Sequence, residues 1–462
     1  MGDVSQLSFF RKEPCKKTYV VYENNQRTKV EYRKLRTVPY LLLPSTIDKS
    51  FLSGYNSREL SPITKVENCP YKESKMAKMQ LIATTTFGIE AVVARELNWL
   101  GYTDQQVENG RVTFAGDEAA ICRANIWLRS AERILIKVGE FQALTFDELF
   151  EGTKALPWDE WLPENAEFPV DGRSVNSKLS SVPDCQAIVK KAIVEKLKLR
   201  YKKQWFEEDG PMYRVEVGLL KDIATLTIDT TGAGLHKRGY RTLTTGAPLK
   251  ETMAAAMLMI SRWKPDRVLI DPFCGSGTIP IEAALIAGNI APGAKRSFTA
   301  ETWHQTPGLL WTKAREEAAD KEKRLPDLRI QGSDIDEEAI SIARYHATQA
   351  GVSQHIHFQR MPVSDISSRY KYGFIICNPP YGERLGEMPE VERLYKELGK
   401  IFKDFDTWSF YVITSHLGFE ALIGRKADKK RKLFNGRIQC NYYQFYGPPP
   451  PRPKFSSITL QT

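Results

Sequence analysis

The stretch Asn378-Pro379-Pro380-Tyr381 places an amide, two prolyl carbonyls and an aromatic ring side by side. The Asn378 side-chain oxygen and the Pro379 carbonyl can accept both protons of an exocyclic amine, and the double proline fixes their spacing. The Tyr381 ring can stack on a flat base. We interpret these four residues as catalytic, since together they suit chemistry on a planar ring that bears an amino group. Because the motif is short, a proline-rich turn with a surface tyrosine is the alternative interpretation.

This stretch follows an apolar run, residues 373–377, that predicts a buried strand. The strand must end at Asn378, because Pro379 and Pro380 lack the N–H donors that continue a sheet ladder. Ligands of open α/β sheets bind at the carboxyl ends of the strands. The sequence therefore predicts that a rigid polar loop borders a ligand site at one edge of such a sheet.

A second predicted strand, residues 267–271, leads into a glycine-rich turn and an alanine-rich helix over residues 279–287. Glycines there allow a ligand to contact backbone N–H groups at a helix N-terminus. A Walker phosphate loop is excluded because no lysine follows Gly277, and a dinucleotide fingerprint is excluded because Pro280 replaces its third glycine. A smaller adenosine compound such as S-adenosyl-L-methionine fits the remaining pattern. We assign to it Asp271, Phe273, Cys274, Gly275, Gly277 and Thr278.

Acidic residues follow the next two predicted strands, residues 328–334 and 356–360. We assign Asp334 to the ribose hydroxyls and Ile335 to the adenine face, and Asp365 could accept the adenine amino group. Asp336 would bind the cofactor and also cap a helix over residues 337–350. The simpler interpretation is that Asp334 and Asp336 only cap this helix. Asn378, at the next strand end, completes the predicted cofactor site.

Two basic segments precede these motifs: a lysine-rich helix over residues 184–203 and a glycine-containing loop over residues 232–241. Such a loop brings cationic groups close to phosphates while a ring, here Tyr240, can stack on a base. Most lysine-rich helices are only solvated faces, so the loop is the stronger signal. The residues that we predict to bind RNA are Lys190, Lys191, His236, Lys237, Arg238 and Arg241.

The composition narrows the class of protein. The chain has 462 residues, 42% of them apolar, enough for two or three domains with their own cores. Its seven cysteines are scattered without a Cys-x-x-Cys pair, which argues against a zinc site, an iron–sulfur cluster and a secreted disulfide framework. Neither an apolar run of membrane-spanning length nor a signal-peptide core occurs. We expect a cytoplasmic protein with no metal and no membrane contact, and its oligomeric state stays open.

Residues 1–75 hold much of the formal net charge of +10, with 14 basic against 8 acidic residues. They show no sustained helical or strand periodicity. Two interpretations stay open: translation starts at Met76, so that the segment is not part of the protein, or the segment is a basic arm that binds RNA. Regular structure is expected from Met79 onward.

Four strand ends in succession thus present the turn after Asp271, then Asp334, Asp365 and Asn378. In this order the chain resembles the class I S-adenosylmethionine-dependent methyltransferases over residues 245–462. The loop at 236–241, Ala-Pro-Leu-Lys-Glu at 247–251 and Asn-Pro-Pro-Tyr-Gly-Glu-Arg at 378–384 resemble more narrowly the bacterial THUMP-domain 23S rRNA guanine-N2 methyltransferases. That resemblance covers the chain except for its first 75 residues.

The resemblance implies a domain order: a basic extension (1–75), a ferredoxin-like domain (76–150), a THUMP RNA-binding domain (151–240) and a methyltransferase domain (241–462). The pattern over 79–150, strand-helix-strand-strand-helix-strand, agrees with it. The predicted fold class is α/β: a Rossmann-like doubly wound sheet with a terminal antiparallel hairpin, preceded by an α+β region.

Local patterns add smaller predictions. Strands are predicted at 167–170 and 174–178, a helix that opens with Pro248 in its first turn, and a long crossover over 289–325. The basic run 426–432 would form the turn of the terminal hairpin.

The resemblance also implies the reaction, transfer of a methyl group from S-adenosyl-L-methionine to an exocyclic amine in RNA, with guanine N2 in 23S rRNA as the expected target. The base must be single-stranded or flipped out to be reached. A DNA adenine-N6 methyltransferase would use the same loop chemistry. A non-catalytic RNA-binding ribosome-assembly factor is a second alternative, but such a protein would be expected to have lost one of the four motifs, and none is lost here.

Overall fold

The structure is a computed structural model that describes residues 78–243, 248–325, 327–382 and 388–451, together with the backbone of three strands nearer the N-terminus. These are β1 (Phe10–Lys12), β2 (Thr18–Glu23) and β3 (Gln26–Glu31), which pair antiparallel in that order. Regular structure thus begins earlier than the sequence pattern predicts. Residues 1–73 and 74–462 form two separate compact units, and all the predicted site residues lie in the second.

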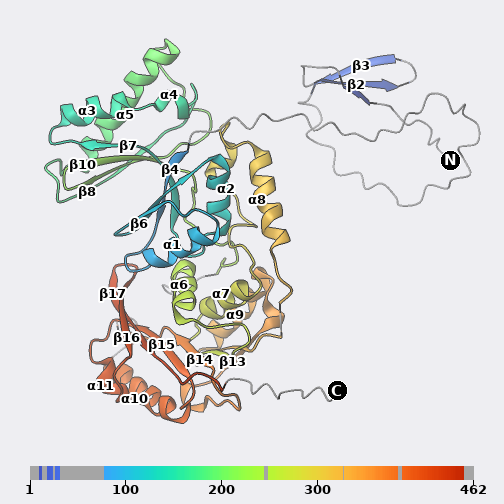
Figure 1. The fold of residues 1–462 in the computed structure, drawn as a ribbon, viewed down its shortest axis with the longest axis vertical. Helices are drawn as coiled ribbons and strands as arrows, with labels where there is room; N and C mark the ends of the chain where they lie inside the picture. The colour runs from blue at the N-terminus through green and yellow to red at the C-terminus, as the bar shows by residue number, and fades with distance from the viewer. Residues whose placement is uncertain are drawn as a thin grey trace, which may run out of the picture. The chain divides into compact units, whose positions relative to one another are not determined.

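The N-terminal half of the second unit is built on one seven-stranded sheet (Figure 1). Its first elements are β4 (Met79–Thr84), α1 (Glu90–Trp99), β5 (Gln105–Glu108), β6 (Arg111–Gly116), α2 (Glu118–Trp127) and β7 (Arg133–Gln142). Helix α2 begins after Asp117, whose carboxylate accepts the Ala120 N–H at 2.8 Å and caps the helix. The order of elements is the one predicted for the ferredoxin-like region.

The following elements extend the same sheet: α3 (Phe146–Ala155), α4 (Trp158–Trp161), β8 (Val170–Val175), α5 (Val182–Tyr201), β9 (Val215–Leu220) and β10 (Ile223–Asp229). Because β10 pairs with β7, the ferredoxin-like and THUMP regions share one sheet of order β5-β6-β4-β7-β10-β9-β8. The prediction of two strands at 167–170 and 174–178 is wrong. Pro169 has no N–H to donate, so the single strand starts after it, and Glu167 forms only an isolated bridge with Met212.

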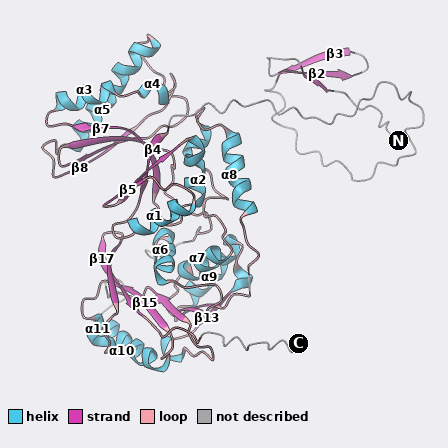
Figure 2. Ribbon diagram, viewed as in Figure 1, coloured by secondary structure: helices cyan, strands magenta, loops and turns pink. Residues whose placement is uncertain are grey.

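A second seven-stranded sheet forms the C-terminal half (Figure 2). Its strands are β11 (Leu269–Asp271), β12 (Ile330–Asp334), β13 (Ile356–Arg360), β14 (Phe374–Cys377), β15 (Ser409–Thr414), β16 (Lys429–Asn435) and β17 (Ile438–Phe445). In the order β13-β12-β11-β14-β15-β17-β16 the first five strands pair in parallel, and β17 pairs antiparallel with both β15 and β16. The predicted doubly wound sheet with a terminal hairpin is confirmed.

Helices cover both faces of this sheet (Figure 1). The longer ones are α6 (Glu251–Ser261), α7 (Thr278–Ala287), α8 (Gly308–Asp320), α9 (Glu337–Ala350) and α10 (Met388–Asp404), and the shorter ones are α11 (Phe419–Ile423), η3 (Thr299–Thr302), η4 (Ser353–His355) and η5 (Val363–Asp365). Alternate residues of β14 face opposite sides: Ile376 packs into the core that contains α6, α7 and α9, whereas Ile375 and Cys377 pack into the core with α10 and α11. These two cores fix the strand end that carries Asn378.

Two local predictions are wrong, and a third is filled in by the structure. Helix α6 begins at Glu251, so Pro248 precedes it instead of lying in its first turn. The basic run 426–432 lies largely along β16, and the turn of the hairpin is formed by Gly436 and Arg437, where Gly436 has a φ of +64° that suits glycine. The long crossover contains a helix, α8, which packs Trp311 against the core.

Candidate active site

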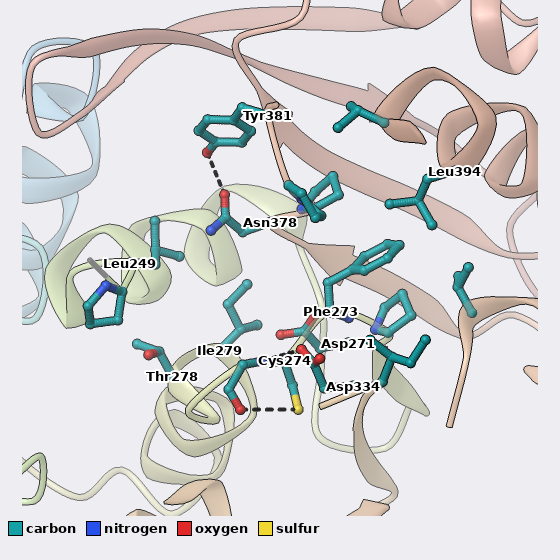
Figure 3. A pocket seen from close by; sticks show the side chains of 18 of the residues that line it. Leu249, Asp271, Phe273, Cys274, Thr278, Ile279, Asp334, Asn378, Tyr381 and Leu394 are labelled. Carbon is teal, nitrogen blue, oxygen red and sulfur yellow. Dashed lines mark hydrogen bonds between the residues drawn. The ribbon is translucent and has the colours of Figure 1, made fainter. Parts of the chain in front are cut away.

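A cavity of about 600 Å³ lies at the carboxyl ends of β11, β12 and β14 (Figure 3). Its wall contains most of the residues predicted to bind cofactor or substrate: Asp271, Phe273, Cys274, Gly275, Thr278, Asp334, Ile335, Asn378, Pro379, Pro380 and Tyr381. Parallel strands end at one edge of a sheet, which is why segments far apart in sequence meet here. The sequence did not single out Leu249, Met361 or Val363, which line the same cavity, nor Glu390, Arg393 and Glu397 from α10.

The glycine-rich turn is held to the neighbouring strand end by Asp334. The Gly275 N–H donates to Asp334 Oδ2 at 2.9 Å, and the Asp336 N–H donates to Asp334 Oδ1 at 3.1 Å. A Cβ on Gly275 would meet no atom within 4 Å, so its backbone borders open space where a ligand can approach it closely. Asp334 therefore shapes the turn and also faces the cavity.

Asp271 is a buried carboxylate in the cavity wall, with 1% of its surface exposed. Burial raises the pKa of Asp271 well above its usual value, and the nearby Asp334 carboxylate raises it further, against the Phe273 N–H that Asp271 Oδ1 accepts at 3.2 Å. A cation bound in the cavity would offset the free-energy cost of ionising the buried Asp271. Ser276 Oγ, buried in the same wall, finds no hydrogen-bond partner among the described residues.

Three residues assigned to the cofactor do not line the cavity. Gly277 directly precedes α7 with a φ of +83°, and a Cβ there would lie 3.0 Å from both Ala343 and Phe358, so the backbone conformation and the close packing both favour glycine. Asp336 is exposed and caps α9 by accepting the Glu338 N–H at 2.9 Å, as the simpler interpretation predicted for it. Asp365 is exposed and accepts a hydrogen bond from the Ser364 hydroxyl at 2.9 Å.

The loop after β14 is held by a hydrogen bond within the loop and by hydrogen bonds from helix α10. The Tyr381 hydroxyl donates a short hydrogen bond to Asn378 Oδ1 (Figure 3), and burial raises the pKa of Tyr381 well above its usual value. The Tyr395 hydroxyl, from α10, donates to the Pro380 carbonyl at 2.7 Å and lies 2.8 Å from Thr414 Oγ1. No role was predicted for Tyr395, because it falls on the apolar face of a helix, where a tyrosine has no distinguishing signal.

The structure does not place Arg238 and Arg241 on the surface, where the predicted RNA contacts would need them. Both side chains are turned into the protein. Arg238 Nε lies 3.4 Å from Glu282 Oε1, with side-chain exposures of 2% and 0%. Arg241 donates to Thr278 Oγ1 at 2.6 Å and lies 3.5 Å from the Glu251 carboxylate. These arginines join the segment after β10 to α6 and α7, next to the cavity.

The other four predicted RNA-binding residues divide into two kinds. Lys190 is half-buried against Glu208 at 2.7 Å and donates to the Phe168 carbonyl at 3.0 Å. His236 lies 3.2 Å from Glu132, a carboxylate whose burial is outweighed by hydrogen bonds from His236, Thr252 and Lys250, so that its pKa falls to about 2. Lys191 and Lys237 are exposed and remain candidates for RNA contact.

Among the described residues no group of three or more His, Cys, Asp or Glu side chains could hold a metal ion. In the same part of the chain every helix is too short or too polar to cross a membrane.

Three family models match the chain in succession. The "RlmL ferredoxin-like domain" matches residues 80–135, the "THUMP domain" residues 143–229 and the "RMKL-like, methyltransferase domain" residues 238–444. The first two matches lie on the N-terminal sheet and the third spans the cavity.

Proteins of similar sequence carry related names. One from Bacillus subtilis (strain 168), named "Putative RNA methyltransferase YpsC", is 55% identical over 381 residues, which cover 82% of this chain and 99% of that protein. The "Ribosomal RNA large subunit methyltransferase K/L" of Syntrophotalea carbinolica (strain DSM 2380 / NBRC 103641 / GraBd1) is 35% identical over 383 residues, or 80% of this chain. The chain spans 54% of the length of that K/L protein.

Solved structures agree with these matches. The crystal structure of SMU.472 complexed with SAH, which is 47% identical, superposes with a TM-score of 0.77 and covers 81% of this chain and 99% of that one. A crystal structure described as "a predicted N6-adenine-specific DNA methylase from Listeria monocytogenes str. 4b F2365" is 53% identical, with a TM-score of 0.76 and coverages of 80% and 97%. SAH is what remains of S-adenosylmethionine after it gives up its methyl group. The chain belongs to the family of THUMP-domain class I S-adenosylmethionine-dependent RNA methyltransferases.

Proposed function

We propose that this chain methylates the exocyclic N2 amine of a guanine in 23S rRNA, in the cytoplasm, with S-adenosyl-L-methionine as the methyl donor. The observation that supports this best is the position of Asn378, whose side chain lies in the cavity wall across from the glycine-rich turn (Figure 3). The relative named for the large ribosomal subunit supports 23S rRNA as the substrate.

The cavity wall fits S-adenosyl-L-methionine by its chemistry. The cofactor's positive charges would offset the cost of ionising the buried Asp271. We propose that Asp334 also binds the ribose hydroxyls, that Ser276 Oγ gains a partner, and that Ile335 and Val363 cover the adenine. When bound, the cofactor supplies an electrophilic methyl group on its sulfonium centre.

Replacing Asp334 by alanine should weaken cofactor binding by roughly 10-fold to 100-fold, the scale of a lost charge-assisted hydrogen bond. Asp334 faces the cavity and holds the Gly275 N–H, so both the contact and the shape of the turn are lost. Calorimetry with S-adenosylhomocysteine measures the change. Asp365→Ala is the matched control, since this exposed carboxylate lies outside the cavity, and its affinity should equal that of the wild type. Equal affinities in both variants would contradict the assignment.

We propose that the loop after β14 prepares the amine for attack. A guanine N2 is nearly planar and poorly nucleophilic because its lone pair is shared with the ring. If Asn378 Oδ1 and the Pro379 carbonyl accept its two protons, the nitrogen becomes pyramidal and its lone pair points toward the methyl group. The Tyr381 hydroxyl occupies one lone pair of Asn378 Oδ1 and leaves the second for the amine. As the nitrogen gained the methyl carbon, the bond from that carbon to the sulfonium sulfur would break and leave its electron pair on sulfur. The nitrogen would then lose one proton to water, so alignment replaces a strong base.

Methylation of adenine N6 in DNA is the alternative, supported by the description of the Listeria structure and by the same acceptor chemistry. Incubation of the full chain with cofactor and either unmodified rRNA or DNA, followed by digestion to nucleosides and mass spectrometry, separates the two. We expect N2-methylguanosine from the RNA sample. N6-methyldeoxyadenosine from the DNA sample, with unmodified RNA, would favour the alternative.

Lys191 and Lys237 should contribute to RNA affinity through phosphates. The double variant Lys191→Ala/Lys237→Ala is expected to bind rRNA more weakly and to lower the slope of log affinity against log salt concentration by about 1.4, since each lost phosphate contact to a single strand removes about 0.7. Fluorescence anisotropy over a salt series measures this slope. Lys313→Ala/Lys403→Ala removes the same charge from exposed positions on α8 and α10 and should leave the slope unchanged. Equal slopes in all three proteins would remove these two lysines from the RNA site.

A further inference from the structure

The loop that follows β4 is fixed against the terminal hairpin beside the cavity. Arg431 donates to the Gly88 carbonyl at 3.0 Å, and the rings of Phe87 and Phe434 lie 5.9 Å apart at 80° to each other. Gly88 has a φ of +92°, and a Cβ there would come within 2.4 Å of the Lys432 carbonyl. This close approach, possible only for glycine, holds the ferredoxin-like region against strand β16.

Strand β16 leads directly to the proposed target-base site. Its last residue, Asn435, lines the cavity together with Tyr381. Phe434 precedes Asn435 by one residue, a step of about 3.3 Å, and because side chains alternate along a strand its ring lies on the opposite face of β16 from Asn435. The pair Phe87 and Phe434 therefore lies one strand residue from the cavity wall, on the other face of the last strand of the sheet, where an RNA strand that leaves the cavity can pass around this edge.

The surface around this pair is both aromatic and basic. Phe87 is 42% exposed, an unusual position for a phenylalanine. The Lys432 ammonium is exposed and lies 5.5 Å from the centre of the Phe434 ring. Lys429 and Arg437 are also exposed on the hairpin, whereas Lys430 is paired with Glu420 at 2.7 Å. Strand β16 is the edge strand of its sheet, so one edge of this basic strand has no partner strand within that sheet.

We propose that Phe87 and Phe434 form a stacking subsite for the nucleobase adjacent to the target, with Lys432 and Arg437 contacting its phosphate. Single-stranded nucleic acids are bound by this combination of aromatic faces and cations. When a base is flipped into a pocket, the neighbouring bases lose a stacking partner, and an aromatic side chain can take the place of that partner. This inference rests on the proposed function, because the occupant is the RNA strand that carries the target.

The test compares Phe87→Ala, Phe434→Leu and Trp99→Ala in methylation of rRNA from cells that lack the gene. Phe434→Leu keeps an apolar side chain at the interface, and Trp99 is a control aromatic on α1 with 68% exposure. We expect Phe87→Ala and Phe434→Leu to raise KM for RNA about 10-fold, the scale of one lost stacking contact, with kcat and cofactor affinity unchanged. Trp99→Ala should behave as the wild type. An unchanged KM in both phenylalanine variants, in an enzyme that methylates RNA, would overturn the subsite and leave the proposed function intact.

Binding gives a second measurement that does not depend on catalysis. A short single-stranded oligoribonucleotide with 2-aminopurine next to a guanine should show a stacking-dependent change of fluorescence with the wild type and a smaller one with Phe87→Ala. If the wild type binds and stacks this probe but methylates no RNA, the subsite stands and the proposed function fails. If the fluorescence change is the same in wild type and Phe87→Ala, the subsite is wrong.

Discussion

Replacement of Asn378 by alanine is expected to slow single-turnover methyl transfer to unmodified rRNA by about 10²–10³-fold, the usual scale for a lost preorganised polar contact. The variant lacks the side-chain acceptor for the amine, yet Asp271, Gly275 and Asp334 are untouched, so the affinity for the cofactor should hardly change. Rapid-quench kinetics with saturating enzyme measures the first quantity and calorimetry the second.

Tyr381→Phe is the matched control for this prediction. It keeps the ring that we propose stacks on the target base and removes only the hydroxyl that donates to Asn378 Oδ1. The expected loss is about 5-fold, corresponding to one hydrogen bond of roughly 1 kcal/mol that orients the amide. Tyr381→Ala should lose about 1–3 kcal/mol more through the missing stack. A near-normal single-turnover rate for Asn378→Ala would refute the acceptor role.

Arg238→Ala is expected to lower the free energy of unfolding by about 3 kcal/mol, near the lower end for a buried ion pair that loses one partner. The substitution leaves Glu282 buried and removes the donors to the Leu235 and Arg129 carbonyls. Arg129 stays close enough to Glu282 to offset part of its charge, which places the loss at the lower end of that range. Urea unfolding followed by tryptophan fluorescence measures the difference.

Lys237→Ala is the control for stability, because the neighbouring lysine is exposed and its loss should change the free energy of unfolding by less than about 0.5 kcal/mol. A double variant, Arg238→Met/Glu282→Leu, should be more stable than Arg238→Ala because no charge is left buried alone. If Arg238→Ala were as stable as Lys237→Ala, the ion pair would not join the two halves of the unit as the structure indicates.

The strand ends could be predicted from the sequence because each carries a strong local signal. Pro379 and Pro380 cannot continue the buried strand that ends at Cys377, and the glycine-rich turn after Asp271 marks the end of another buried strand. Parallel strands then bring these ends together without further information. Asn378, Asp271 and Asp334 therefore lie together in the cavity wall, as predicted, and their roles are proposals.

The basic loop was misjudged because its partners lie elsewhere in the chain. His236 to Arg241 resembles a solvated loop when read alone, but Glu282 stands in the otherwise apolar helix α7 and Glu251 at the start of α6. A single acid within a buried helix needs a cationic partner, which is a signal that the sequence does contain. Asp365 lies outside the cavity for another reason: the chain after β13 turns through Met361 and Val363, which line the cavity instead.

Helix α8 could not be predicted from hydrophobic periodicity alone. Its buried residues, Trp311, Ala314 and Ala318, have helical spacing, but two of them are alanines and charged residues surround them. Such a weak apolar stripe does not stand out from a polar loop, and only packing against α2 and the core distinguishes it.

The central claim is that Asn378 presents a guanine N2 in rRNA to the methyl group. The most direct test is mass spectrometry of nucleosides in rRNA from a strain without the gene, complemented with either the wild type or Asn378→Ala. The account predicts that one N2-methylguanosine of 23S rRNA disappears in the deletion strain, returns with the wild type and does not return with Asn378→Ala at equal protein levels. Restoration of that nucleoside by Asn378→Ala, or its presence without the gene, would contradict the account.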